Sequence, residues 1–146
     1  MKPDELHSLY DEILTEGNSI FSTTMGIVSH IVDDEYEIVA VKSIANVFVS
    51  GESFPLNQTY CRDVCSTGKT IAITELDGKP GMQCHPLYNN LPIEAYISTP
   101  IKKHEKIWGT LNFSSMIVRS QPFDNSDIEF IQSSAERISF ALSDIS

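Results

Sequence analysis

Two runs of alternating apolar residues, 95–101 and 107–113, constrain the fold of this chain most strongly. A short polar segment with three lysines and a histidine separates them. Alternation at every second residue places apolar side chains on one face of a strand, and two such runs around a short turn predict a β-hairpin. The runs 25–32 and 36–43, which flank an acidic turn at residues 33–35, predict a second hairpin. We therefore expect an antiparallel sheet at the centre of the fold.

A helix is expected close to the N-terminus. Pro3 and Asp4 are favourable first-turn residues, and apolar side chains follow them at helical spacing. These side chains are Leu6, Tyr10, Ile13 and Leu14. The helix either ends at the Gly17-Asn18 pair or continues through Phe21.

The last helix has the clearest signature in the sequence. Ser126 and Glu129 match a capping box, and Asp124 and Asp127 lie close to the positive end of the helix. Apolar residues then repeat at alternating steps of three and four over nearly three heptads. They are Ile128, Ile131, Ala135, Ile138, Leu142 and Ile145. Such a stripe packs either in the core or against a partner helix, and its length favours a partner helix, hence a homodimer.

The segment between the hairpins predicts a short helix followed by a short strand. Thr59 is suited to begin the helix, and Gly68 is placed to close it in a left-handed conformation. The β-branched run 70–73 predicts the strand. Together these elements predict an α+β domain spanning residues 1–146. A central antiparallel sheet of about five to six strands should carry the N- and C-terminal helices on one face, with loops and short helices on the other.

Composition narrows the classes of partner. The chain has 20 acidic and 10 basic residues, a formal charge of -10 and a sequence pI near 4.6. Such a surface repels phosphate backbones and anionic lipids, so neither nucleic acid nor a membrane is an expected partner. The charged N-terminal segment does not read as a signal peptide, and the three cysteines include no C-x-x-C pair. We therefore expect reduced thiols and a cytoplasmic location.

Four segments of the chain resemble GAF domains, the small sensory modules of signalling proteins. They are TYCRDVCSTGKTIAI at 59–73, HPLYNNLPIEAYISTPI at 85–101, GTLNFSS at 109–115 and FDNSDIEFI at the start of the last helix. The combination is most similar to GAF domains attached to bacterial diguanylate cyclases and sensor kinases. The resemblance implies a non-catalytic sensory or regulatory domain. It also implies helical dimerisation and a signal passed along the terminal helices to an output domain or partner protein.

The resemblance further implies a small-molecule pocket between the sheet and the loops of residues 46–58 and 74–92. Its expected lining consists of Tyr60, Cys61, Arg62, Cys84, His85, Tyr88, Tyr96, Asn112 and Ser114. No cofactor is expected, although the small molecule itself is not identified by these residues. A domain that has lost its ligand and serves only for interaction is a further possibility, and it would have its pocket filled by its own side chains.

Cys84 and His85 also fit a bilin-binding photosensory GAF domain. In phytochromes and cyanobacteriochromes a Cys-His pair, with a Tyr three residues after the His, attaches a bilin, and Tyr88 occupies that place here. This chain departs from that pattern in three ways. Pro86 follows the histidine, the spacing to the next strand is about one residue short, and no Asp-based pyrrole-binding motif precedes the pair. These departures favour a structural turn with an incidental thiol.

Two further cysteine chemistries remain as alternatives. Some small GAF proteins reduce free methionine sulfoxide with a nucleophilic cysteine and a resolving one, and Cys84 and Cys61 lie close to two of that family's positions. Asn112 and Ser114 stand where that family has the acidic pair that holds the substrate amine, so no enzymatic activity is expected.

A zinc site is the other alternative, and it would need Cys61, Cys65, Cys84 and His85 as ligands. Because C-x3-C is not a usual zinc spacing, no metal site is expected.

Overall fold

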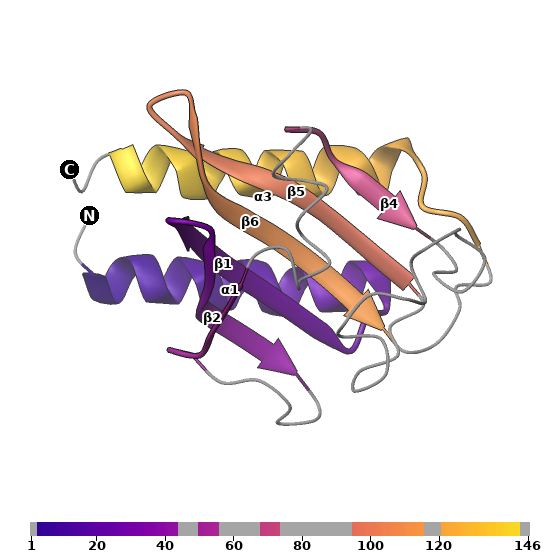
Figure 1. The fold of residues 1–146 in the computed structure, drawn as a ribbon. Helices are drawn as coiled ribbons and strands as arrows, with labels where there is room; N and C mark the ends of the chain where they lie inside the picture. The colour runs from indigo at the N-terminus through magenta and orange to yellow at the C-terminus, as the bar shows by residue number, and fades with distance from the viewer. Residues whose placement is uncertain (1–2, 44–49, 56–67, 74–94, 116–120, 144–146) are drawn as a thin grey trace.

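A six-stranded antiparallel sheet carries two long helices on one of its faces (Figure 1). The computed structural model describes residues 3–43, 50–55, 68–73, 95–115 and 121–143. The helices are α1 (Pro3–Phe21) and α3 (Asn125–Ser143). The strands are β1 (Met25–Val32), β2 (Glu35–Ser43), β3 (Ser53–Pro55), β4 (Ile71–Ile73), β5 (Ala95–Lys103) and β6 (Lys106–Ser115), and their order in the sheet is β3-β2-β1-β6-β5-β4. This arrangement confirms the predicted α+β fold.

Both predicted hairpins are present, and each closes through two residues with positive φ. Asp33 and Asp34 have φ values of 50° and 63° between β1 and β2, and His104 and Glu105 have values of 53° and 68° between β5 and β6. Two consecutive residues with positive φ give the turn whose twist matches that of the flanking strands. The hairpins join through β1 and β6, so strands distant in sequence form the centre of the sheet.

Helix α1 continues through Gly17 to Phe21, the second of the two predicted alternatives. Gly17 does not end the helix because its missing side chain makes room for the ring of Phe113. A Cβ atom at Gly17 would lie 2.1 Å from Cζ of Phe113. The helix ends instead at Phe21. The next residue, Ser22, has a φ of 55°, and the Thr23 N–H donates to the carbonyl of Asn18 at 3.1 Å.

The capping box of α3 differs from the predicted one by two residues. The Asp127 N–H donates to Oδ1 of Asp124, and the Asp124 N–H donates to Oδ2 of Asp127, each at 3.0 Å. Ser126 lies inside the helix, so the predicted pairing of Ser126 with Glu129 is wrong. Asp124 takes the capping role because a carboxylate accepts the free N–H groups of the first turn and also favours the positive helix end.

The apolar stripe of α3 packs into the domain's own core. Four of its members are at most 5% exposed and belong to one cluster with α1 and the sheet: Ile131, Ala135, Ile138 and Leu142. Ile128 is half-buried against the same cluster, and Ile145 lies outside the described residues. The four buried side chains therefore cannot also contact a partner helix, which corrects the role predicted for them. Homodimerisation itself stays a prediction.

The two helices lie side by side and run in opposite directions along the sheet (Figure 1). An ion pair between Arg137 and Glu12, at 3.5 Å, links their exposed surfaces. The predicted packing of the terminal helices on one face is thereby confirmed. Neither described helix is long and apolar enough to cross a membrane.

Candidate functional site

The side of the sheet opposite α1 and α3 is buried and largely polar. Leu111 and Phe113 of β6 point into the helix-covered core, so the alternating residues of that strand face the other side. The same alternation applies to the other central strands. We call this surface the polar sheet face and define it as Ile27, Ser29, Tyr36, Ile38, Tyr96, Ser98, Thr110, Asn112 and Ser114. All nine are at most 5% exposed.

Hydrogen bonds between strands organise the polar sheet face. The hydroxyls of Ser29 and Thr110, which stand opposite each other on β1 and β6, lie 2.6 Å apart, and the Thr110 N–H also donates to Ser29 Oγ at 3.2 Å. The Asn112 side-chain amide donates to the Tyr36 hydroxyl at 3.1 Å. Because buried polar groups in a fully bonded network resist rearrangement, these residues form a rigid floor.

Ser114 is the exception on this floor. The residue is 1% exposed, and its hydroxyl has no hydrogen-bond partner among the residues that the structure describes. It stands opposite Tyr96 on β5 and opposite Met25 on β1. A buried hydroxyl without a partner costs about 1–3 kcal/mol, so such a group calls for an explanation. A ligand that hydrogen-bonds to Ser114 would supply one.

The structure brings together three of the nine predicted pocket residues. Tyr96, Asn112 and Ser114 share the polar sheet face on the neighbouring strands β5 and β6. The other six, Tyr60, Cys61, Arg62, Cys84, His85 and Tyr88, lie outside the described residues. So does Cys65, and so do the loops predicted to cover the pocket, apart from residues 50–55. The bilin, redox and zinc hypotheses therefore rest on positions that the structure does not describe.

Sequence reasoning missed several polar members of the face. Ser29, Tyr36, Ser98 and Thr110 were not among the predicted pocket residues, although each is buried there. A usable signal was present, because a polar residue within an otherwise apolar, alternating strand indicates a hydrogen-bonded position on the inner face. Ser98 and Asn112 also stand opposite each other, so their strands share one polar row.

The polar sheet face is electrically neutral. Its nine residues contribute hydroxyl, phenol, amide and aliphatic groups and no formal charge. The two described groups whose pKa is clearly displaced lie on the helix-covered side: burial raises the pKa of Tyr10 to about 12, and burial lowers the pKa of His30. The imidazole of His30 is stacked on Trp108, with ring centroids 4.3 Å apart. The nine residues of the face thus offer hydrogen-bonding groups.

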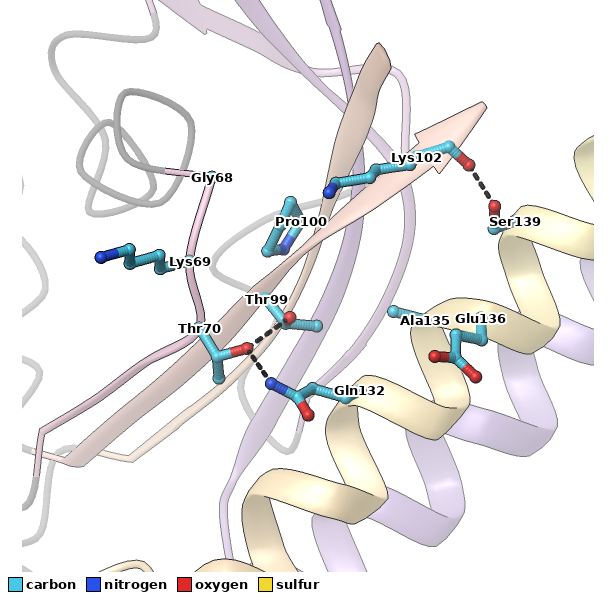
Figure 2. A pocket seen from close by; sticks show the side chains of 10 residues that line it. All are labelled: Gly68, Lys69, Thr70, Thr99, Pro100, Lys102, Gln132, Ala135, Glu136 and Ser139. Atoms are coloured by element: carbon cyan, nitrogen blue, oxygen red, sulfur yellow. Dashed lines mark hydrogen bonds between the residues drawn. The ribbon is translucent and has the colours of Figure 1, made fainter. Parts of the chain in front are cut away.

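A groove lies on the helix-covered side, at the edge of the sheet (Figure 2). It has a volume of about 440 Å³ and lies between residues 68–70, strand β5 and helix α3. We call it the strand–helix groove. Gly68, at one end of it, has a φ of 67°, the left-handed conformation predicted for this position. The groove is separate from the predicted pocket, which belongs to the opposite face of the sheet.

Comparison with protein families gives one match over nearly the whole chain. The model of the GAF domain matches residues 5–142. No curated protein matches the chain in a sequence comparison.

Many solved structures share the fold at low sequence identity. The blue-light absorbing form of the PixJ GAF domain from Thermosynechococcus elongatus is 16% identical, with a TM-score of 0.75, over 97% of this chain and 87% of that one. The phycocyanobilin-bound GAF domain of a cyanobacterial phytochrome is 16% identical, with a TM-score of 0.74, over 93% and 85% of the two chains. The GAF domain of an Acinetobacter phosphoenolpyruvate-protein phosphotransferase is 12% identical, with a TM-score of 0.72, over 96% and 91%. At such identities the likeness establishes the fold alone.

Proposed function

This chain belongs to the GAF domain family, and we propose that it is a non-catalytic sensory or regulatory module that binds a small molecule on the polar sheet face. The observation that carries the proposal is the hydroxyl of Ser114, which lies in a buried, otherwise hydrogen-bonded polar surface and has no partner among the described residues. A protein core without a ligand would gain stability from an apolar residue at this position. The presence of a hydroxyl at this position therefore supports a role in binding.

The chemistry of the face suggests the class of ligand. Neutral hydroxyl and amide groups can hydrogen-bond to a ligand that carries no charge. Tyr36 and Tyr96 add aromatic surface beside the polar row of Ser98 and Asn112. A small, neutral, planar molecule with donors and acceptors along its edge fits such a surface, because binding sites combine apolar walls with a few placed polar groups. We propose a ligand of this class.

Binding would act through the helices. A ligand that favours one arrangement of the sheet and its loops shifts the population of that arrangement. Because α1 and α3 pack directly on the opposite face of the same strands, such a shift would reach the terminal helices. We propose that the signal passes from them to an output domain or partner protein, of the kind found in cyclase and kinase signalling in the cytoplasm.

The binding proposal is tested with a library of neutral heterocyclic compounds, screened by thermal unfolding and confirmed by calorimetry. A true ligand should raise the unfolding temperature of the natural protein and bind Ser114→Ala more weakly. Ser133→Ala, an exposed position on α3, is the matched control and should bind normally. If every compound bound Ser114→Ala as tightly as the natural protein, the proposed site would be wrong.

We propose that the module has no enzymatic activity. The described part of the polar sheet face offers no carboxylate, imidazole or amine, and Asn112 and Ser114 are poor partners for a substrate ammonium. The test is thioredoxin-dependent turnover of free methionine sulfoxide by the purified protein. Sustained turnover that is lost in Cys84→Ser would establish the reductase activity and overturn this part of the proposal.

A covalent bilin at Cys84 is the second candidate function. The phycocyanobilin-bound domain above and a phycoerythrobilin-bound GAF domain of a cyanobacterial phytochrome share this fold. The departures at Pro86 and in the spacing before β5 weigh against it. The protein is co-expressed with enzymes that make phycocyanobilin, and its absorbance and intact mass are measured. Visible absorption with an added covalent mass, both absent in Cys84→Ala, would establish attachment; an unmodified colourless protein would exclude it.

We also propose that the module forms a homodimer through the exposed side of α3. With the apolar stripe buried, Phe140 becomes the apolar side chain available there, at 81% exposure. Light scattering after size-exclusion chromatography should give a dimer for the natural protein and a monomer for Phe140→Ser. Val32→Ser, at another exposed apolar residue, is the control and should stay dimeric. A monomeric natural protein would overturn the proposal.

A further inference from the structure

The strand–helix groove has a hydrogen-bonded floor built from three elements. The Gln132 side-chain amide of α3 donates to Oγ1 of Thr70 at 2.9 Å, and Thr70 Oγ1 lies 2.8 Å from Oγ1 of Thr99 on β5 (Figure 2). Farther along, the Ser139 hydroxyl of α3 donates to the backbone carbonyl of Lys102. These contacts tie the helix to the edge of the sheet at two points and hold the groove open between them.

Three charged residues line the groove, Lys69 and Lys102 on the sheet side and Glu136 on the helix side. The side chain of Lys69 points away from Pro100 and Glu136 (Figure 2). Lys102 enters from β5 and Glu136 from α3 (Figure 2). Within the described part of the chain, two ion pairs connect α1 to β2 and to α3, but neither Lys102 nor Glu136 takes part in one. Lys102 and Glu136 therefore offer the groove a cationic and an anionic group that do not neutralise each other.

The remaining walls suit a small polar molecule. Pro100 and Ala135 give apolar contact. The side-chain amide of Gln132 donates to Thr70, whereas no described residue donates a hydrogen bond to the side-chain carbonyl oxygen of Gln132. The volume of about 440 Å³ falls within the range of small-molecule sites, roughly 300–1,000 Å³.

We propose that the strand–helix groove is a second binding site, separate from the polar sheet face, for a small zwitterion such as a free amino acid with a polar side chain. The carboxylate of the ligand pairs with Lys102 and its ammonium pairs with Glu136. A ligand with one charge satisfies one of these groups and is repelled by the other. A simple anion is disfavoured further because the protein as a whole carries a charge of -10.

The experiment uses the complete, isotopically labelled chain and three related compounds. L-Glutamine carries both charges, 4-aminobutanamide lacks the carboxylate, and glutaramate lacks the ammonium. Titration followed by amide NMR should shift the signals of Gly68, Thr70 and Ser139 with L-glutamine. Each single-charge compound should bind about fivefold more weakly or worse, the loss expected for one partly exposed ion pair.

Substitutions assign the two charges to their residues. Lys102→Gln and Glu136→Gln should each weaken L-glutamine binding about fivefold. Neither should disturb folding, because neither side chain forms an ion pair with a described residue. Lys106→Gln and Glu129→Gln are the controls: both residues are exposed, lie on β6 and α3, and do not line the groove. They should bind like the natural protein.

Three results would overturn the inference. The first is an absence of shifts at the groove up to the solubility limit of L-glutamine. The second is equal binding of glutaramate and L-glutamine, which would make the groove a plain anion site. The third is shifts confined to Asn112 and Ser114, which would place the compound on the polar sheet face. The last result would leave the proposed function standing, so the two proposals fail separately.

Discussion

The side-chain amide of Asn112 donates a hydrogen bond to the hydroxyl of Tyr36, 3.1 Å away, across the intervening strand β1. Both residues are buried on the polar sheet face. The bond connects β6 with β2, which are not neighbours in the sheet. It therefore fixes the position of the Tyr36 side chain relative to the polar row of Ser98 and Asn112 on β5 and β6. The surface that this face offers to a ligand is therefore preorganised.

Removal of the Tyr36 hydroxyl should therefore destabilise the domain. Tyr36→Phe leaves the buried Asn112 amide short of one acceptor and should cost about 1 kcal/mol of unfolding free energy. Urea unfolding measures the cost as a lower midpoint at constant slope. Tyr10→Phe is the matched control, because no described residue bonds to the Tyr10 hydroxyl, and it should unfold like the natural protein. Equal midpoints for the two variants would contradict the prediction.

Ser114 should behave in the opposite way. Ser114→Ala removes a buried hydroxyl that no described residue bonds to, so the ligand-free protein should become more stable by about 1 kcal/mol. Ser29→Ala on the same face removes a hydroxyl bonded to Thr110 and should lose about 1–3 kcal/mol. Chemical unfolding of both variants provides the comparison. A destabilised Ser114→Ala would show that the hydroxyl has a structural partner after all.

Local pattern was sufficient to predict the strands and their turns. The alternation in β5 and β6 reflects one sheet face that packs on the helices. The polar residues His104 and Glu105 form the turn between the two strands. The same holds for β1 and β2. These predictions succeeded because each depends on residues that are adjacent in sequence.

The polar sheet face could be predicted only in part. Asn112 and Ser114 followed from the family resemblance, whereas Ser29 and Tyr36 depend on how the two hairpins join. That junction is long-range, and the register between β1 and β2 shifts after Val28, so that Ser29 pairs with Ile38. A shift of one residue exchanges the faces of a strand. Sequence alternation alone does not locate such a shift.

Tertiary contacts also determine which surface the apolar stripe of α3 packs against. A repeat of three and four residues describes a helix that packs on a sheet as well as one that packs on a partner. Ile131 and Ile138 are fully buried against the sheet and α1, and this burial distinguishes the two cases. The repeat itself carries no information about which surface covers it.

Gly17 should tolerate no side chain, although it lies within a helix. Alanine exceeds glycine in helix propensity by about 1 kcal/mol, but a Cβ atom would overlap the ring of Phe113. Gly17→Ala should lose about 1–3 kcal/mol through this overpacking, measured by thermal unfolding. Ser19→Ala, at an exposed position of the same helix, is the control and should be neutral or slightly stabilising. A stabilised Gly17→Ala would mean that Phe113 moves aside freely.

The N-terminal cap of α3 gives a prediction that distinguishes Asp124 from Ser126 as the capping residue. Asp124→Ala removes the acceptor for the Asp127 N–H and should cost about 1 kcal/mol. Ser126→Ala, inside the first turn, should change stability by less than about 0.5 kcal/mol. Urea unfolding compares the two variants. If Ser126→Ala were the more damaging, the capping box would begin at Ser126 as the sequence pattern suggested.

His30 should make the domain less stable in mild acid. Burial lowers its pKa below the ordinary 6.5, with Lys103 lowering it further and Glu37 opposing the shift. The folded state therefore binds fewer protons than the unfolded state between the two pKa values, and stability is lost as the pH falls from 6.5 toward the folded pKa. Trp108, the single tryptophan, stacks on this imidazole with ring planes 12° apart, so its fluorescence should follow the titration with a midpoint below pH 6.5.

Two variants test the assignment to His30. His30→Gln should abolish the fluorescence step and flatten the pH dependence of unfolding, whereas His104→Asn in the exposed turn should change neither. A midpoint above 6.5 would mean that Glu37 outweighs burial, and a step that survives in His30→Gln would assign the titration to another group.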